Sequence, residues 1–253
     1  MKLCDTHVHS FRTFVGDKNM RLPNIAKRAE ELGIDTVVIT DHLMKGRDVE
    51  ELRLMGNDVL AFRTSMPKTN VLFGVEVCEV NSQGLTLLDE SLISNIALNL
   101  VIGGVHETHV APGASLEEVA RVQHAHHMMM MRNPLITILV HPWWFDKEEF
   151  DRLGLPWPED LSFVPEELTR ELGRASAETK TYIEISTMSG LCNRDTGDKF
   201  KASLREYYRI LRDEGAYFAI GTDAHELSEL NTIEEAVKLV QELEIPEDRF
   251  WQP

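Results

Sequence analysis

Short β-branched apolar runs alternate along this chain with longer segments of helical periodicity. The apolar runs cover residues 2–9, 35–42, 70–77, 99–106, 136–142, 181–186 and 216–225. The segments between them predict helices near residues 22–32, 47–64, 115–132, 165–178, 199–214 and 232–243. The first of these helices shows one apolar stripe from Leu22 to Leu32, and Gly33 follows as a stop signal.

This alternation indicates βαβ units and therefore a parallel sheet. Seven strands in 253 residues fit a closed α/β barrel better than an open sheet. Since no Gly/Ser linker or low-complexity tract divides the sequence, we predict a single domain over residues 1–253. Residues 81–89 break the pattern and predict a short hairpin or an excursion.

A polar residue of a metal-binding type ends nearly every apolar run. These residues are His9, His42, Glu76, His106, His141, Glu184 and His225. The first run, "DTHVHS", also places Asp5, His7 and His9 at alternate positions, which share one face of a strand. In a parallel α/β barrel the carboxyl ends of the strands gather on one face, so we expect these side chains to meet there.

The expected cluster is the ligand set of a divalent metal centre. It comprises His7, His9, His42, Glu76, His106, His141, Asp223 and His225. Imidazoles and carboxylates at this density suit Zn²⁺, Mn²⁺ or Fe²⁺, and buried carboxylates repel one another unless cations neutralise them. Eight ligands exceed the needs of one tetrahedral ion, so we predict two or three ions. Glu76 is placed to bridge two of them, with a bridging hydroxide as nucleophile.

Composition and charge narrow the choice of partners. The formal net charge of −16 opposes binding to nucleic acid or to anionic membranes, because the long-range repulsion slows the approach of polyanions. No apolar run approaches the roughly 18 residues that span a bilayer. Three cysteines without a CxxC pair, and an amino terminus unlike a signal peptide, predict a cytoplasmic protein. The sequence does not indicate an oligomeric state.

Six motifs in order, "DTHVHS", "ITDH", "GVEV", "GGVH", "LVHP" and "GTDAH", resemble the polymerase and histidinol phosphatase (PHP) superfamily. The resemblance runs from Leu3 to about Leu243. It implies a distorted (β/α)7 TIM-like barrel whose trinuclear metal site lies at the carboxyl ends of the strands and hydrolyses phosphoesters.

The resemblance also implies how the ligands divide. The first metal would be held by His7, His9, Glu76 and Asp223, the second by Glu76, His106 and His141, and the third by His42 and His225. The family often supplies a further ligand shortly after HxH, and Asp17 is the candidate here at a slightly long spacing. Glu76, Asp223 and His225 are the expected catalytic residues.

Several residues outside this set carry predictions for substrate binding. Family phosphatases have "SG" and an arginine near the phosphate, which points to Ser189 and Arg194 in "STMSGLCNR". Arg12 is a further candidate because an arginine fork suits phosphate, although both arginines can equally lie on the surface. His109 is a candidate to touch the substrate.

Three polar features are expected to support the fold or the site without binding metal. Asp5 is expected to hydrogen-bond a ligating imidazole, and Asp41 to have a structural role. The tract "HAHHMMMMR" at residues 124–132 falls in a helical segment. We expect its methionines to pack in the core and His124 and His127 to lie at the rim.

Three functions are compatible with these sequence features. The first is a metal-dependent phosphoesterase for a small phosphorylated metabolite or nucleotide; the acidic balance argues against a proofreading exonuclease, which needs a basic track. The second is an amidohydrolase-type metal hydrolase, which also opens with HxH but usually needs a lysine on a middle strand. The third is a metal-stabilised binding barrel without catalysis.

Overall fold

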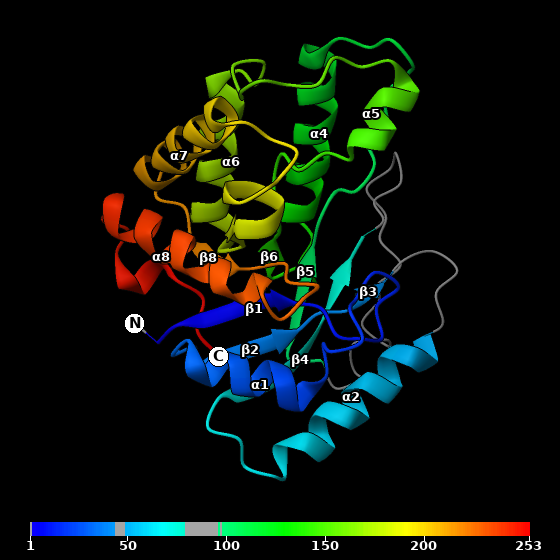
Figure 1. Ribbon diagram of the computed structural model, residues 1–253. Helices are drawn as coiled ribbons and strands as arrows, with labels where there is room; N and C mark the ends of the chain where they lie inside the picture. The colour runs from blue at the N-terminus through cyan, green and yellow to red at the C-terminus, as the bar shows by residue number, and fades with distance from the viewer. Residues whose placement is uncertain (1, 44–48, 79–95, 97) are drawn as a thin grey trace.

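The computed structural model describes residues 2–43, 49–78, 96 and 98–253, and its centre is a parallel sheet (Figure 1). Its described strands are β1 (Cys4–Val8), β2 (Thr36–Ile39), β3 (His42–Leu43), β4 (Asn70–Val77), β5 (Leu100–Gly103), β6 (Ile138–Leu139), β7 (Tyr182–Ser186) and β8 (Phe218–Gly221). The order is β1-β2-β4-β5-β6-β7-β8, and β3 pairs with β4. Each predicted apolar run contains a strand; residues 81–89 lie outside the described residues.

The sheet nearly closes on itself because β8 returns to β1. The backbone N–H of Asp223 donates to the carbonyl of His7 at 2.8 Å, and that of His9 donates to the carbonyl of Ala224 at 3.0 Å. The pairing of β1 with β2 shifts register between Asp5 and Val8, so the first strand is irregular there. The predicted distorted TIM-like barrel is confirmed.

Helices cover the outside of the sheet (Figure 1). The described α-helices are α1 (Leu22–Glu31), α2 (Val49–Arg63), α4 (Leu116–Met131), α5 (Lys147–Leu153), α6 (Glu166–Thr179), α7 (Asp198–Asp213) and α8 (Ile233–Glu242). A π-helical turn, η1 (Thr187–Leu191), follows β7, and two 3₁₀ turns are η2 (Glu229–Thr232) and η3 (Glu247–Arg249). None of the helices in the described ranges is long and apolar enough to cross a bilayer.

All six predicted helices are present, and α5 is an additional one. The hydrophobic pattern does not predict α5, but the residues that cap its two ends mark it in the sequence. The Asp146 carboxylate accepts from the backbone N–H groups of Glu148 and Glu149 at 2.7 and 3.1 Å, which begins the helix. Gly154, with φ of 66°, ends it in the left-handed conformation.

The two faces of the strands build two hydrophobic layers. On β4, Phe73 and Val75 belong to the large core beneath the helices, whereas Leu72 belongs to a separate inner cluster. That cluster gathers Cys4, Val38, Leu72, Leu100, Ile102, Ile138, Val140, Ala219 and Trp251, and therefore fills the interior of the barrel. Further along the same face of β4 comes Glu76, so the barrel interior changes from apolar to polar toward the carboxyl ends.

Candidate metal centre

The carboxyl ends of the strands bring the eight expected cluster residues together. His7 and His9 come from the end of β1, His42 from β3 and Glu76 from β4. His106, His141, Asp223 and His225 follow β5, β6 and β8. Their potential ligand atoms form overlapping groups in which all atoms lie within 4.8 Å of one another. The convergence that the strand-end pattern predicts is therefore present in the structure.

The Glu76 carboxylate lies at the centre of this cluster. Its Oε1 is 3.2 Å from His106 Nε2 and 2.9 Å from His141 Nε2. Its Oε2 is 3.1 Å from His42 Nε2, 3.4 Å from His7 Nε2 and 3.5 Å from His9 Nε2. Each oxygen thus faces its own set of imidazoles, which is the arrangement that a carboxylate bridging two cations needs.

Hydrogen bonds at the far side of the rings orient several imidazoles toward this centre. Three ring N–H groups donate to oxygens that only accept: Nδ1 of His7 to Glu184 Oε1 at 2.9 Å, Nδ1 of His106 to the carbonyl of Gly104 at 3.3 Å, and Nδ1 of His225 to the carbonyl of Asp223 at 3.0 Å. In the neutral imidazole the other nitrogen, Nε2, then carries a lone pair. Metal-binding histidines are commonly held in this way.

The crowding of lone pairs fits bound cations. Nε2 of His7 lies 3.0 Å from Nε2 of His9, although both side chains are buried. Glu76 Oε2 and His225 Nε2 are buried atoms without a hydrogen-bond partner. Unpartnered buried polar atoms are costly in a folded protein, and a shared cation satisfies several at once. The residues present therefore fit divalent metal ions.

Burial and charge set the protonation states in opposite directions across the cluster. Burial lowers the pKa of His42 to about 2 and that of His225 to about 4, which favours the neutral, ligating imidazole. Burial alone would raise the pKa of Glu76, but the nearby imidazoles of His42 and His7 hold it well below its usual value. The pKa of His7 stays well above its usual value despite burial, because Asp223 and other carboxylates surround it.

Glu184 positions two parts of the cluster through hydrogen bonds. One oxygen accepts from His7 Nδ1, and the other accepts from the backbone N–H of His141 at 2.8 Å, so this residue links β7 to β1 and to the segment after β6. A Cβ at Gly221 would overlap Glu184 Oε1, which explains the glycine there. The role expected of Asp5 thus belongs to Glu184. The Asp5 carboxylate accepts from the hydroxyl of Thr222 at 2.7 Å and not from an imidazole.

Two cluster residues have a left-handed backbone. His141 has φ of 30° and Asp223 has φ of 56°, conformations that cost energy in residues other than glycine. Both lie directly after a strand, where the turn carries the side chain into the cavity. Gly104 makes room for one of them, because a Cβ there would lie 2.9 Å from His141 Nε2.

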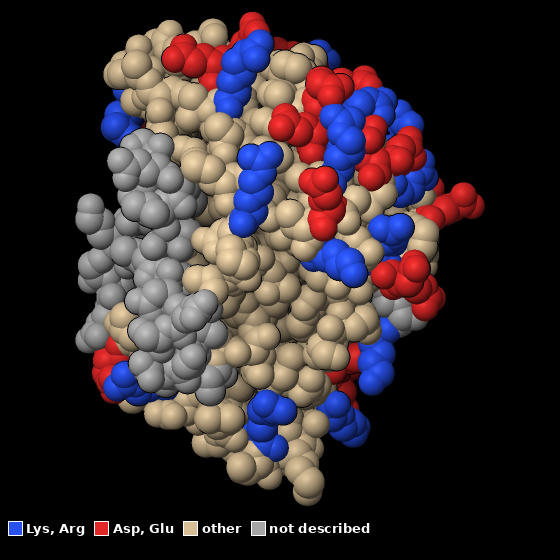
Figure 2. Space-filling model, turned by 180° about the vertical axis from the view of Figure 1, so that it is seen from behind, with Lys and Arg blue, Asp and Glu red and all other residues tan. Residues whose placement is uncertain are grey.

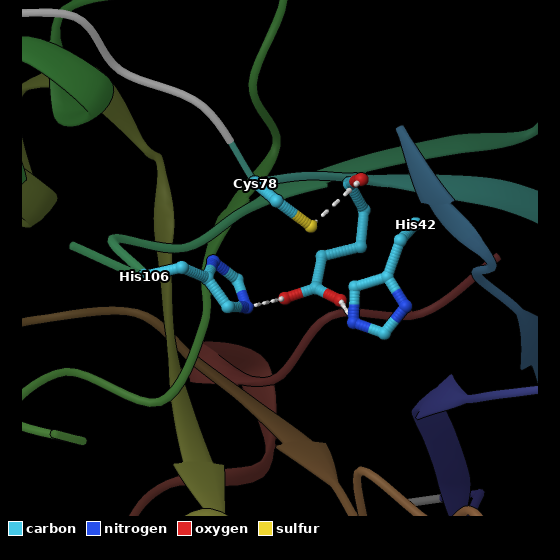
Figure 3. A group of neighbouring side chains, drawn as sticks. His42, Cys78 and His106 are labelled. Atoms are coloured by element: carbon cyan, nitrogen blue, oxygen red, sulfur yellow. Dashed lines mark hydrogen bonds and ion pairs between the residues drawn. The ribbon is translucent and has the colours of Figure 1, made fainter. Parts of the chain in front are cut away.

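Cys78 joins the cluster, although no sequence motif assigned it a role. Its Sγ forms one group of potential ligand atoms with His42, Glu76 and His106 (Figure 3). Cys78 stands two residues after Glu76, as His9 stands two residues after His7. The same alternation rule that pairs the two histidines would have placed this thiol beside the carboxylate.

Beside the cluster lies a cavity of about 380 Å³, and Ser189 is on its wall. The Ser189 hydroxyl donates to Asp223 Oδ2, so this predicted substrate residue does lie at the centre. Phe14, Trp144 and Met188 give the wall an apolar part, while Asp146 and Glu229 give it acidic groups. Among the described residues that line the cavity, none is Lys or Arg.

Four other candidates lie away from this wall, each with a local partner or in solvent. Arg12 forms an ion pair with Asp58 of α2 at 2.7 Å, and Arg194 is exposed after η1. The ring of His109 packs against His126 with centroids 4.7 Å apart. The Asp17 carboxylate accepts from the backbone N–H of Asn19 at 2.7 Å in a tight turn. The structure does not bring these side chains to the cluster.

Asp41 has the expected structural role: it accepts from the backbone N–H and hydroxyl of Ser10 at 2.7 and 2.6 Å.

Comparisons with known proteins agree with this geometry. The sequence matches no model of a protein family. It is 26% identical over 253 residues to a probable phosphatase of Thermoanaerobacter sp. strain X514, covering 98% of this chain and 89% of the relative. It is 24% identical over 249 residues to the probable phosphatase YcdX of Escherichia fergusonii, covering 97% and 88% of the two chains.

Solved structures share the fold. The histidinol phosphate phosphatase of Lactococcus lactis, determined with zinc, L-histidinol and phosphate, has a TM-score of 0.66 at 18% identity, covering 97% of this chain and 95% of that chain. The dihydropyrimidinase of Brevibacillus agri has a TM-score of 0.50 at 10% identity, covering 98% and 68%. The motif order, the barrel and the cluster around Glu76 agree with these comparisons: the chain is similar to probable phosphatases over nearly its whole length and shares the fold of a histidinol phosphate phosphatase, as its resemblance to the polymerase and histidinol phosphatase (PHP) superfamily predicts.

Proposed function

We propose that this protein is a metal-dependent phosphoesterase that hydrolyses a small phosphorylated metabolite or nucleotide. The observation that carries the proposal is the convergence of buried imidazoles on Glu76 beside a cavity. The names of the relatives support the reaction class, since they are described as probable phosphatases, and the Lactococcus structure contains zinc and phosphate.

Two or three divalent cations are the proposed cofactors. The split environment of Glu76 supports its bridging role: His106 and His141 face one oxygen, while His7, His9 and His42 face the other. Asp223 Oδ1, 3.0 Å from His9 Nε2, completes the first set, and His225 stacks on His9 with ring centroids 4.2 Å apart. Zn²⁺, Mn²⁺ and Fe²⁺ all accept this donor set. When bound, such cations neutralise phosphoryl oxygens and lower the pKa of the attacking water.

The protein's own groups orient and hold charge around the reacting phosphoryl group. Glu76 stays ionised because imidazoles surround it, and Ser189 fixes the Asp223 carboxylate through a hydrogen bond. His225 is unprotonated at neutral pH because burial lowers its pKa to about 4. We assign catalytic roles to these three groups, Glu76, Asp223 and His225, on this basis. Glu184 is a positioning residue, since it acts through His7 and His141.

The size and charge of the surroundings favour a small substrate. A cavity of about 380 Å³ suits a metabolite or a mononucleotide. On the face seen in Figure 2, Lys and Arg side chains are interspersed with Asp and Glu over α6 and α7 and do not form a continuous basic track. Many of these charges pair with one another, as in the ion pairs Arg170–Glu214 and Arg209–Asp213. The expected absence of a stable nucleic-acid partner and the cytoplasmic location remain predictions.

Cations at the described cluster would supply positive partners for the phosphate in this cavity. Ser189 supplies a hydroxyl beside them. The phosphate contacts predicted for Arg12 and Arg194 would require these side chains to turn away from the positions seen here.

The decisive experiment measures hydrolysis of a panel of phosphate esters, as release of phosphate from phosphomonoesters and as release of the leaving alcohol from phosphodiesters. The protein is depleted of metal with a chelator and then reloaded with Mn²⁺ or Zn²⁺. We expect release after reloading, none after depletion, and none from Glu76→Gln in either state. The proposal would be overturned if the reloaded protein hydrolysed none of these esters.

The amidohydrolase alternative draws support only from the shared barrel. Such enzymes usually carry a lysine on a middle strand, whereas Glu76 occupies the corresponding position at the end of β4. The described strand ends that face the cluster carry no lysine. Hydrolysis of an amide or lactone by the reloaded protein, without release of phosphate, would revive this alternative. Metal retention with no hydrolysis at all would favour the binding barrel.

A further inference from the structure

The thiol of Cys78 reaches the metal-type cluster from the end of β4. Its Sγ lies within 4.8 Å of ligand atoms of His42, Glu76 and His106, and these residues come from three different strand ends (Figure 3). The residue is 4% exposed, so the thiol is shielded from solvent. Its Sγ is 3.6 Å from the carbonyl oxygen of Glu76, to which the thiol donates.

Strand geometry explains why the thiol faces the cluster and not the core. Leu72, Gly74, Glu76 and Cys78 alternate along β4 with Phe73, Val75 and Val77, which belong to the core beneath the helices. The backbone N–H of Cys78 donates to the carbonyl of Leu43 at 3.3 Å, so the strand pairing with β3 extends to this residue. The orientation of the thiol is thus fixed by the sheet.

We infer that Cys78 is a thiolate ligand of one cation, which it shares with His42, Glu76 and His106, and that it makes this position selective for a soft ion. The inference rests on the proposed metal centre. Two imidazoles, a carboxylate and a thiolate are four protein ligands, the number that Zn²⁺ takes in tetrahedral sites. Thiolates favour Zn²⁺ and Co²⁺ over Mn²⁺, which prefers oxygen.

Binding of the cation exchanges one bond for another without any redox change. The S–H bond of Cys78 breaks, its proton leaves to solvent, and the sulfur electron pair forms the bond to the cation. No oxidant or reductant is needed. The hydrogen bond from the thiol to the Glu76 carbonyl is lost in the same step.

The two other cysteines provide matched controls. Cys4 lies in the inner apolar cluster of the barrel, and Cys192 packs beside the core after η1. Neither belongs to a group of potential metal ligands among the described residues. Cys192→Ser removes a thiol of the same chain without touching the cluster, and Cys78→Ser keeps the size of the side chain while replacing sulfur by oxygen.

The test follows the near-ultraviolet charge-transfer absorption between thiolate and cobalt while metal-depleted protein is titrated with Co²⁺. We expect this band in the unchanged protein and in Cys192→Ser, and its loss in Cys78→Ser and Cys78→Ala. Competition between Zn²⁺ and Mn²⁺ should show a preference for Zn²⁺ that falls about 10- to 100-fold in the Cys78 variants. Circular dichroism checks that each variant folds.

The possible outcomes separate this inference from the proposed function. A Co²⁺-loaded unchanged protein without the band, or a band that survives in both folded Cys78 variants, would overturn the role of the thiol. Phosphate release by the reloaded protein would still leave the phosphoesterase standing. Conversely, a Cys78-dependent band in a protein that releases no phosphate would support the ligand and refute the proposed function.

Discussion

Two regions of this protein concentrate buried histidines, and only one of them has the geometry of a metal centre. At the barrel mouth, residues far apart in the sequence converge on the Glu76 carboxylate. On α4, His124, His126 and His127 are neighbours in sequence, yet their rings take separate partners. His124 pairs with Glu171 at 3.0 Å, His126 packs against His109, and His127 packs against Trp143 with centroids 5.0 Å apart.

The difference shows that local density of histidine is a poor guide to metal binding. A helix points successive side chains in different directions, whereas parallel strands of a barrel point their ends into one space. The methionines of α4 pack in the core as predicted, but the histidines do not lie at its rim. They are buried, His127 to 1% exposure, because α6 and the segment after β6 cover this helix.

The electrostatics of the two regions differ accordingly. At the mouth, carboxylates hold the pKa of His7 well above its usual value despite burial. On α4, burial, with the neighbouring charge of His109, lowers the pKa of His126 to about 4. Burial likewise holds the pKa of His127 well below its usual value. The barrel mouth thus contains carboxylates next to imidazoles, an environment suited to a cation, whereas the imidazoles of α4 are neutral and packed in the core.

The largest expected effect comes from removing the charge at the centre of the mouth. Glu76→Gln should lower kcat/KM for a phosphoester at least about 1,000-fold, since several kcal/mol of transition-state stabilisation depend on the cations it holds. Elemental analysis should show at least one metal ion fewer per chain. His126→Leu is the matched control, and its activity should stay within about twofold. Equal losses in the two variants would erase the contrast between the regions.

Metal removal should destabilise the mouth and leave the α4 region without a specific response. A ligand present at about 1,000 times its dissociation constant stabilises a folded protein by about 4 kcal/mol. Thermal unfolding with and without chelator should therefore differ by several degrees in the unchanged protein and in His126→Leu, but hardly in Glu76→Gln. If chelator did not alter the unfolding temperature of the protein without substitutions, the centre would not be stabilised by metal.

Acid should lower the stability of the protein through the buried histidines of α4. The pKa of His126 is about 4 when folded and about 6.5 when unfolded, so the unfolded chain binds more protons between these values. The free energy of unfolding should fall as pH drops from 6.5 toward 4. In chelator, His126→Leu should reduce that fall by about 1 kcal/mol between pH 7.5 and 5, measured by urea unfolding. An identical pH profile for both proteins would show that this ring is not desolvated.

The smallest effects distinguish side chains at the cavity from those outside it. Ser189→Ala should lower kcat about tenfold, because the hydroxyl holds the Asp223 carboxylate in place. Arg194→Ala should change kcat and KM by less than about threefold, since the side chain is exposed and does not line the cavity. Steady-state kinetics with one ester measures both. A larger loss in Arg194→Ala would mean that the loop after η1 closes on the substrate.

The barrel and the convergence of the candidate ligands follow from the sequence because both depend on periodicity. Strand runs of period 2 and their polar ends locate His7, Glu76 and Asp223 at one mouth, and the structure brings these residues together there. Family motifs added the division into metal positions, which stays a prediction.

Details that depend on side-chain direction or on loops were out of reach. Arg12 pairs with Asp58, which is far away in sequence, and Asp17 turns back to its own loop. Glu184 ends an apolar run of the sequence, but its two hydrogen bonds depend on the positions of β1 and of the segment after β6. Cys78 is the exception. Its spacing from Glu76 was readable, yet no motif drew attention to it.

The most direct test of the central claim is a crystal structure of the metal-reloaded protein with anomalous data collected at the absorption edge of the metal. We predict at least two anomalous peaks at the barrel mouth, each about 2.0–2.2 Å from a different oxygen of Glu76. Further ligands should be imidazole nitrogens, that of His141 on one side and those of His7 and His9 on the other. Peaks absent from the mouth, or found at the α4 histidines instead, would contradict the account.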